Sequence, residues 1–155
     1  MKLKKFGDWK VVHRILDLLK QGITPEKIAL CTALGISIGI FPVLGSTTLL
    51  CTLAAFIFKV NLPLIQLVNY LAYPLQLLLI LPFIRAGEFL FREAPITLAV
   101  PQMLQMIRQD VLGAIRSLWT VTLHAMAVWL FIGPLLTVIL TRILTPVIRK
   151  LGVKR

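Results

Sequence analysis

The chain has 155 residues; 58% of them are hydrophobic, only 15% are charged, and the formal net charge is +11. Soluble domains carry about 45–50% apolar residues by a similar count, so this composition excludes an ordinary soluble domain and predicts an integral membrane protein. The charge does not predict nucleic-acid binding, because lysines and arginines gather at the ends of the apolar runs. Membrane topology and anionic lipid headgroups explain that pattern.

Residues 1–24 are a basic leader that we expect to form an amphipathic helix on an anionic membrane surface. Its apolar side chains share one helical face and its charged side chains lie opposite. The apolar face comprises Trp9, Val12, Leu16 and Leu19, and the opposite face comprises Lys10, Arg14, Asp17 and Lys20. The leader therefore predicts contact with lipid headgroups rather than a crossing.

Three uncharged runs follow, at residues 28–58, 60–84 and 117–141. Each is longer than the roughly 20 apolar residues that cross a bilayer core. Both termini are rich in lysine and arginine, so the positive-inside rule places both in the cytoplasm and requires an even number of crossings. We therefore expect a multi-pass protein in which one of the three runs does not cross singly.

The first run is too long for one straight span, and it is interrupted near its centre. The pieces 28–40 and 46–58 have 13 residues each, about 20 Å of helix, and neither spans a core of roughly 30 Å. The start of the first piece is predicted by Thr24 as N-cap, Pro25 at the first helical position and Glu26 in the first turn.

The interruption carries residues that end one helix and start another. Pro42 cannot donate a backbone N–H and disfavours helical geometry at the preceding residue. Gly45 permits a turn, and Ser46, Thr47 or Thr48 can cap the second helix. The simplest interpretation is a re-entrant hairpin whose irregular backbone is shielded by protein or by a water-filled cavity. The alternative is one long, tilted span with a kink at Pro42.

Small residues recur along the first piece and predict close helix packing. Ala29, Ala33 and Ser37 repeat every four residues, and Gly35 and Gly39 form a Gly-x-x-x-Gly pair. Such spacing lets helix backbones approach closely in lipid. The expected partner is either the returning half-helix or a second subunit.

The second run is apolar but carries several amides. On a helix, Gln66, Asn69, Tyr73 and Gln76 share one face, and Pro74 bends the helix. Unsatisfied amides are costly in hydrocarbon, so this face should point into the protein or a wet cavity, beside the interruption. The amides either line a binding site or only satisfy the loose backbone groups of the hairpin.

Four short motifs follow one another through this region: G-x-F-P-x-x-G-x-x-T, N-x-P, Y-P-x-Q and P-F-x-x-x-G-E. Their residues are Gly39, Phe41, Pro42, Gly45 and Thr48; Asn61 and Pro63; Tyr73, Pro74 and Gln76; and Pro82, Phe83, Gly87 and Glu88. Over roughly residues 25–92 the chain resembles the domain of unknown function 2062 (DUF2062) family of small bacterial membrane proteins. The resemblance implies a bacterial inner (cytoplasmic) membrane protein. Some similar proteins are fused to glycosyltransferase domains, which implies a link to lipid-linked sugars or phospholipids.

A charged group ends the second run, where Arg85, Glu88 and Arg92 fall on one helical face. One interpretation is a salt-bridged turn at the membrane interface. The other is a headgroup site in which the two arginines hold a phosphate.

The rest of the chain is an interfacial connection (93–116), a transmembrane helix (117–141) with a kink at Gly133-Pro134, and a basic tail (142–155), all within one membrane domain. His124 is the ionisable side chain inside that helix, and no second acidic or basic group accompanies it at membrane depth. The sequence has no carboxylate pair, HExxH, Gly-x-Ser-x-Gly or P-loop. Cys31 and Cys51 are interpreted as buried small apolar residues. We expect no enzyme, catalytic residue, metal or cofactor.

These features predict an all-α integral membrane protein with a broken or re-entrant helical hairpin, two transmembrane helices and a basic amphipathic N-terminal helix. Its expected function is transport of a lipid or anionic solute at the broken hairpin, since half-helix N-termini attract anions. One copy has one hairpin, so a closed pathway implies a homodimer. The alternative is a non-transporting subunit that docks a cytosolic enzyme such as a glycosyltransferase. The candidate binding residues are Pro42, Gly45, Ser46, Thr47, Thr48, Gln66, Asn69, Tyr73, Gln76 and Arg85.

Overall fold

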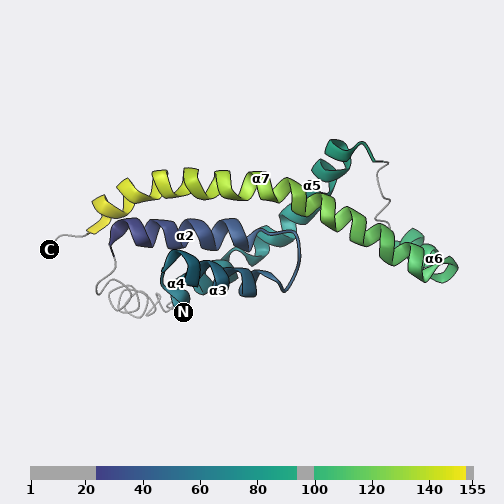
Figure 1. Ribbon diagram of the computed structural model, residues 1–155, viewed down its shortest axis with the longest axis horizontal. Coiled ribbons are helices and arrows are strands. Elements are labelled where there is room, and N and C mark those ends of the chain that lie inside the picture. The colour runs from purple at the N-terminus through teal and green to yellow at the C-terminus, as the bar shows by residue number, and fades with distance from the viewer. Residues whose placement is uncertain (1–23, 94–99, 153–155) are drawn as a thin grey trace, which may run out of the picture.

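A computed structural model describes residues 24–93 and 100–152, and every regular element within these ranges is an α-helix (Figure 1). The predicted amphipathic leader lies outside the described residues. The helices are α2 (Pro25–Gly39), α3 (Thr47–Phe58), α4 (Leu62–Leu71), α5 (Tyr73–Phe91), α6 (Val100–Gln109) and α7 (Val111–Gly152).

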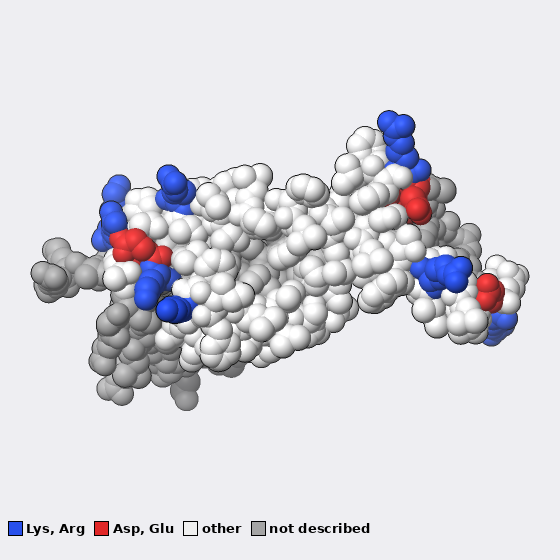
Figure 2. All heavy atoms as spheres, in the orientation of Figure 1, with Lys and Arg blue, Asp and Glu red and all other residues white. Residues whose placement is uncertain are grey.

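Two of these helices are long and apolar enough to cross a membrane, namely Tyr73–Phe91 and the segment Val111–Lys150 of α7. Only 22% and 17% of the residues in their most apolar windows are buried within the chain, so these are not core helices of a soluble fold. On the face shown in Figure 2, charged side chains gather where α2 begins and α7 ends, and again around the end of α5 and α6, with an uncharged surface between. This arrangement is that of a membrane protein.

The first apolar run forms two helices and not one kinked helix. The side chain of Thr24 accepts a hydrogen bond from the backbone N–H of Lys27, at 3.4 Å, and Pro25 opens α2, which confirms the predicted helix start. α2 ends at Gly39, ahead of Pro42. Gly45 then takes a positive φ of 83°, and α3 begins at Thr47 and lies beside α2 (Figure 1).

α2 is the centre of the bundle and contacts α3, α4 and α7. Gly35 and Gly39 face α4: a Cβ at either position would lie 2.7 Å from a Cβ of Val68 or Ala72, respectively. The close partner of the glycine pair is therefore α4. The predicted alternatives for this face, the returning half-helix or a second subunit, were wrong. The pattern of small residues signals a close approach but does not specify which helix makes it.

The second apolar run is divided between two helices. α4 ends at Leu71, α5 begins at Tyr73 with Pro74 in its first turn, and Ala72 alone separates them. Pro74 is tolerated there because residues at the start of a helix need no intrahelical partner for their N–H groups. The predicted single helix with a bend at Pro74 is thus replaced by two helices.

α7 is longer than the predicted 117–141 helix at both ends. It has 42 residues, about 63 Å at 1.5 Å per residue, or roughly twice the thickness of a bilayer core. Pro134 and Pro146 lie inside it. α7 contacts α2, α5 and α6 and runs along the long axis of the molecule (Figure 1).

Candidate functional site

The side chain of Gln76 is buried and forms hydrogen bonds with the backbone of the interruption between α2 and α3. Its Nε2 atom donates hydrogen bonds to the carbonyl oxygens of Phe41, at 2.7 Å, and Val43, at 3.4 Å. Gln76 is only 1% exposed. A broken helix leaves carbonyl groups without their intrahelical partners. The buried amide adds a donor to two of them, beside the Val43 N–H that bonds to Phe41 and the Ser46 hydroxyl that bonds to Val43. The predicted proximity of Gln76 to the interruption is confirmed.

Trp129 of α7 supports the same interruption from a second side. Its indole N–H donates to the carbonyl oxygen of Ser37 at 2.8 Å. Its ring meets Phe41 edge-on, with ring centroids 4.8 Å apart and an interplanar angle of 81°, the favourable T-shaped arrangement. Trp129 was not among the predicted site residues. The signal in the sequence that could have identified it is an indole N–H within a long apolar run, because such a donor needs a polar partner.

The two other amides of the predicted helical face, Gln66 and Asn69, lie between α4 and its neighbours. Nε2 of Gln66 donates to the carbonyl oxygen of Thr48, at 2.9 Å, and to the hydroxyl of Thr52, at 3.0 Å. Asn69 is buried, and its Nδ2 lies 3.5 Å from Oε1 of Gln66. Gln66 therefore joins α4 to α3, and Asn69 lies where α4 packs against the Gly39 end of α2.

Tyr73 does not share this environment. It is 48% exposed, whereas Gln76, in the next turn, is buried. The predicted common face assumed one continuous helix, and the interruption at Ala72 removes that continuity. The inclusion of Tyr73 in a buried stripe was therefore wrong.

The start of α3 differs from the predicted cap. Ser46 occupies the N-cap position, but its side chain makes no capping hydrogen bond; its hydroxyl donates instead to the carbonyl oxygen of Val43 at 2.9 Å. Thr47 is buried, and Thr48 and Gly45 are exposed. No Cβ placed on Gly45 would meet a described atom within 4 Å. The first turn of α3 thus has no side-chain cap and begins beside an open surface.

Pro42 is buried at the interruption, but Arg85 is not brought there. Arg85 follows Gln76 by nine residues on α5, about 14 Å along the helix. Its guanidinium forms an ion pair with Glu88 at 2.8 Å, in which the Glu88 carboxylate is buried and Arg85 is half-exposed. The Arg85–Glu88 part of the predicted salt-bridged turn is thus present at the end of α5, whereas Arg92 is the C-cap residue with a positive φ of 55° and does not continue the helical face.

The interior beside the interruption also holds polar atoms without partners among the described residues. They are Oγ of Ser37, Oδ1 of Asn69 and Oε1 of Gln76. Amide oxygens accept hydrogen bonds only, and a hydroxyl can both donate and accept. Hydrogen-bond acceptors therefore predominate among these polar atoms without partners.

His124 lies in a separate contact between α5 and α7. Its ring stacks on Phe91, with centroids 4.1 Å apart and an interplanar angle of 13°. A Cβ on Gly87 would lie 2.9 Å from the carbonyl carbon of His124, so the two helices are in backbone contact here. Nδ1 of His124 is buried without a partner in the described part of the chain.

The fold and this site define a small helical membrane protein built around a helix interruption that buried amides and a tryptophan hold in place. The chain belongs to the family described as "uncharacterized protein conserved in bacteria (DUF2062)", which matches residues 10–154. The match confirms the resemblance seen in the sequence motifs and extends it over almost the whole chain. No curated protein and no solved structure matches the chain.

Proposed function

We propose that this protein moves an anionic solute or an anionic lipid headgroup across the membrane, with α2 and α3 forming a re-entrant hairpin and the anion binding at the start of α3. One observation carries the proposal: the chain between Gly39 and Thr47 is irregular and lies between the two charged ends of the molecule (Figures 1 and 2). Irregular backbone at membrane depth persists only where protein or water surrounds it.

The chemistry of the interruption supports an anion. The N-terminus of a helix carries partial positive charge and free N–H groups, and broken helices in transporters use this end to bind anionic groups. Here the first turn of α3 lacks a side-chain cap, and Gly45 leaves open space next to it. In this proposal Gly45, Ser46, Thr47 and Thr48 bind the anion.

The amides have a supporting role in the proposal. Gln76 donates its amide N–H to the backbone of the interruption, and Gln66 donates its amide N–H to the backbone of α3. In this proposal they stabilise the geometry of the site and do not bind the anion themselves. Pro42 fixes the end of α2. In a single copy of the chain, Tyr73 and Arg85 are not among the residues that bind the anion. In this proposal a second copy of the chain completes a closed pathway.

The second candidate is a non-transporting membrane subunit that docks a cytosolic enzyme. The observation that favours it is the same use of amide N–H groups: if Gln66, Asn69 and Gln76 only satisfy backbone, the interruption is a structural device. Neither candidate assigns catalysis to the chain.

The deciding experiment is thiol labelling at the interruption in sealed vesicles. A single cysteine replaces the exposed Leu44 in a chain carrying Cys31→Ala and Cys51→Ala, and a membrane-impermeant maleimide is applied from each side in turn. The proposal expects labelling from one side only, slowed at least severalfold by inorganic phosphate or glycerol phosphate.

The matched control is Leu78→Cys, an exposed position in the apolar middle of α5. A lipid-facing thiol is not expected to react, because the maleimide needs a thiolate in water. If Leu44→Cys is as unreactive as Leu78→Cys from both sides, the interruption is packed dry, and the docking subunit replaces the transporter.

A further inference from the structure

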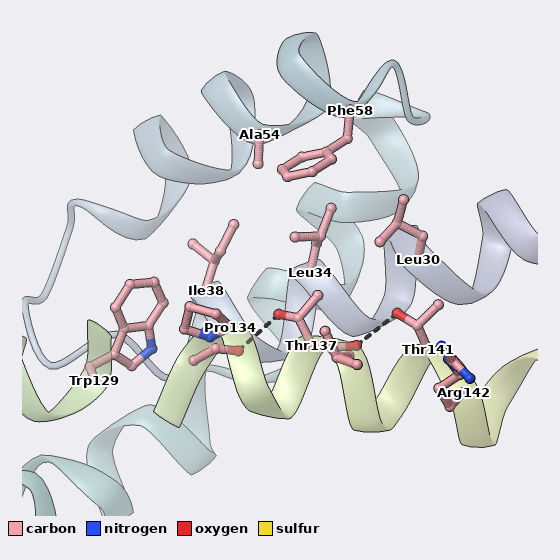
Figure 3. Close-up of a pocket in the computed structure, with 12 residues that line it drawn as sticks. Leu30, Leu34, Ile38, Ala54, Phe58, Trp129, Pro134, Thr137, Thr141 and Arg142 are labelled. Atoms are coloured by element: carbon pink, nitrogen blue, oxygen red, sulfur yellow. Dashed lines mark hydrogen bonds between the residues drawn. The ribbon is translucent and has the colours of Figure 1, made fainter. Parts of the chain in front are cut away.

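α2, α3 and α7 line a groove of about 590 Å³ that shares Trp129 with the interruption but contains none of its buried amides. In Figure 3, Leu30, Leu34 and Ile38 of α2 lie between α3 above and α7 below. Trp129 lies at one end of the groove and Arg142 at the other (Figure 3). The remaining lining residues are Ala54, Phe58, Gly133, Pro134, Thr137, Val138 and Thr141.

The lining of the groove is almost entirely apolar, because its uncharged polar groups are hydrogen-bonded within the chain. The hydroxyl of Thr137 donates to the carbonyl oxygen of Gly133 at 2.9 Å, and that of Thr141 donates to the carbonyl oxygen of Thr137 at 2.7 Å. The indole N–H of Trp129 is bound to Ser37. Among the described lining residues, Arg142 alone is charged. The groove therefore suits an apolar chain that carries an anionic group at one end.

The groove is long enough to extend across the hydrocarbon of one leaflet of a bilayer. Trp129 and Arg142 are thirteen residues apart on α7, about 20 Å along the helix, whereas half of a bilayer core measures roughly 15 Å. The uncharged stretch 117–141 ends at Arg142. Arg142 is thus the point where α7 reaches the headgroup layer, and the groove runs inward from it.

The charge around this end of the molecule favours an anion. Arg149 and Lys150 follow Arg142 on the exposed end of α7, and Lys27 lies near the start of α2. Glu26, the acidic residue in the first turn of α2, is paired with Arg149. Arg142 is exposed and has no ion pair among the described residues.

We propose that this groove binds one acyl chain of an anionic phospholipid from the leaflet on the Arg142 side, with the lipid phosphate on the Arg142 guanidinium. Guanidinium groups are well suited to phosphate because their N–H groups match two of its oxygens. The site contains none of the residues proposed to bind an anion at the start of α3 and does not require transport, so it goes beyond the function proposed above.

Trp129 provides a direct probe of the groove. The chain contains three tryptophans, and the variant Trp9→Phe, Trp119→Phe leaves Trp129 as the sole indole fluorophore. The full chain is placed in nanodiscs of unbrominated phosphatidylcholine that contain a small fixed fraction of acyl-brominated phosphatidylglycerol or, in parallel, acyl-brominated phosphatidylcholine. Bromine quenches indole fluorescence at contact. We expect quenching by the anionic lipid to be about fivefold stronger, the order expected for one basic contact.

Two substitutions separate the headgroup contact from the groove itself. Arg142→Gln should reduce the ratio of quenching by phosphatidylglycerol to quenching by phosphatidylcholine to about one. Arg116 is an exposed arginine near the other end of α7, and Arg116→Gln should leave this ratio unchanged. Thr137→Phe, which fills the groove, should weaken quenching by both lipids at least severalfold.

Two results would overturn the proposal. Equal quenching by the two brominated lipids in the parent chain would show that Arg142 selects no anionic headgroup. The absence of quenching by either lipid would show that lipid does not enter, as when a second copy of the chain covers the groove. Neither result bears on labelling at Leu44, so the failure of this proposal and of the transport proposal remain distinguishable.

Discussion

Nε2 of Gln76 lies 2.7 Å from the carbonyl oxygen of Phe41, thirty-five residues earlier in the chain, and this contact joins the start of α5 to the end of α2. The same amide reaches Val43. One buried side chain thus donates to two carbonyl groups of the interruption. We expect the geometry of the candidate site to depend on it.

Replacing Gln76 tests this dependence. Gln76→Leu removes one of the donors to the carbonyl groups of Phe41 and Val43, which keep the Val43 N–H and the Ser46 hydroxyl, respectively. The free energy of unfolding should therefore fall by about 0.5–1.5 kcal/mol, the net contribution of a hydrogen bond. It is measured by unfolding in sodium dodecyl sulfate from mild detergent, followed by circular dichroism. The matched control is Gln105→Leu on the exposed surface of α6, which should change stability by less than about 0.5 kcal/mol. Equal effects of the two substitutions would contradict the role of Gln76.

The hydrogen bond from Trp129 to Ser37 can be removed while an aromatic ring is retained. Trp129→Phe should lower the free energy of unfolding by about 0.5–1.5 kcal/mol, the net contribution of such a bond. Trp119→Phe, at an exposed position on the same helix, serves as the control and should be close to neutral. A Trp129→Phe protein as stable as the control would show that the bond contributes nothing to the fold.

The contact between Gly39 and Ala72 permits a swap experiment. A methyl at Gly39 would lie 2.7 Å from the Cβ of Ala72, so Gly39→Ala should force α2 and α4 apart and cost about 1–3 kcal/mol. The double variant Gly39→Ala, Ala72→Gly moves the methyl from the residue between α4 and α5 to α2 and should recover at least half of that loss. Additive losses in this double-mutant cycle would mean that the two positions are not coupled.

The ion pair between Glu26 and Arg149 predicts a small dependence of stability on pH. Nε of Arg149 donates to a carboxylate oxygen of Glu26 at 2.9 Å, and this contact holds the pKa of Glu26 below its ordinary value of 4.5. A carboxyl whose folded-state pKa is lowered stabilises the fold above the ordinary value, and that contribution is lost as the pH falls through the lowered pKa.

The measurement is the midpoint of unfolding of the parent chain and of Glu26→Gln from pH 7 to pH 3. The parent should be slightly more stable at pH 7, and the difference should disappear in acid. The effect is small because both side chains are exposed to solvent. A difference that grows as the pH falls would have the wrong sign for this pair.

Local signals in the sequence predicted the local structure. Thr24 and Pro25 set the start of α2, and Gly45 takes the positive φ that its position in the turn required. These residues act on the backbone within a few positions of themselves, so the sequence contains all that is needed. The contact of Gln76 with the interruption also followed, since a buried amide needs a partner and freed carbonyls need a donor.

Contacts between distant helices could not be predicted in the same way. Trp129 and Ser37 are 92 residues apart, and nothing near either residue specifies the other. The exposure of Tyr73 depends on the single residue between α4 and α5, where periodicity alone shows no interruption. Arg142 ends an apolar run in the sequence, but only the packing of α2 against both α3 and α7 makes it the end of a groove.

The position of α7 in the chain also has a consequence for biosynthesis. α2 lies against α7, and Ser37 receives its indole partner only after 92 more residues are made, roughly 5–20 s at bacterial rates of translation. During that interval α2 can pack only against α3 and α4, and the face that α7 later covers stays open to lipid or to the insertion machinery. A chain that stalls before residue 129 therefore lacks both the α7 cover of α2 and the indole partner of Ser37.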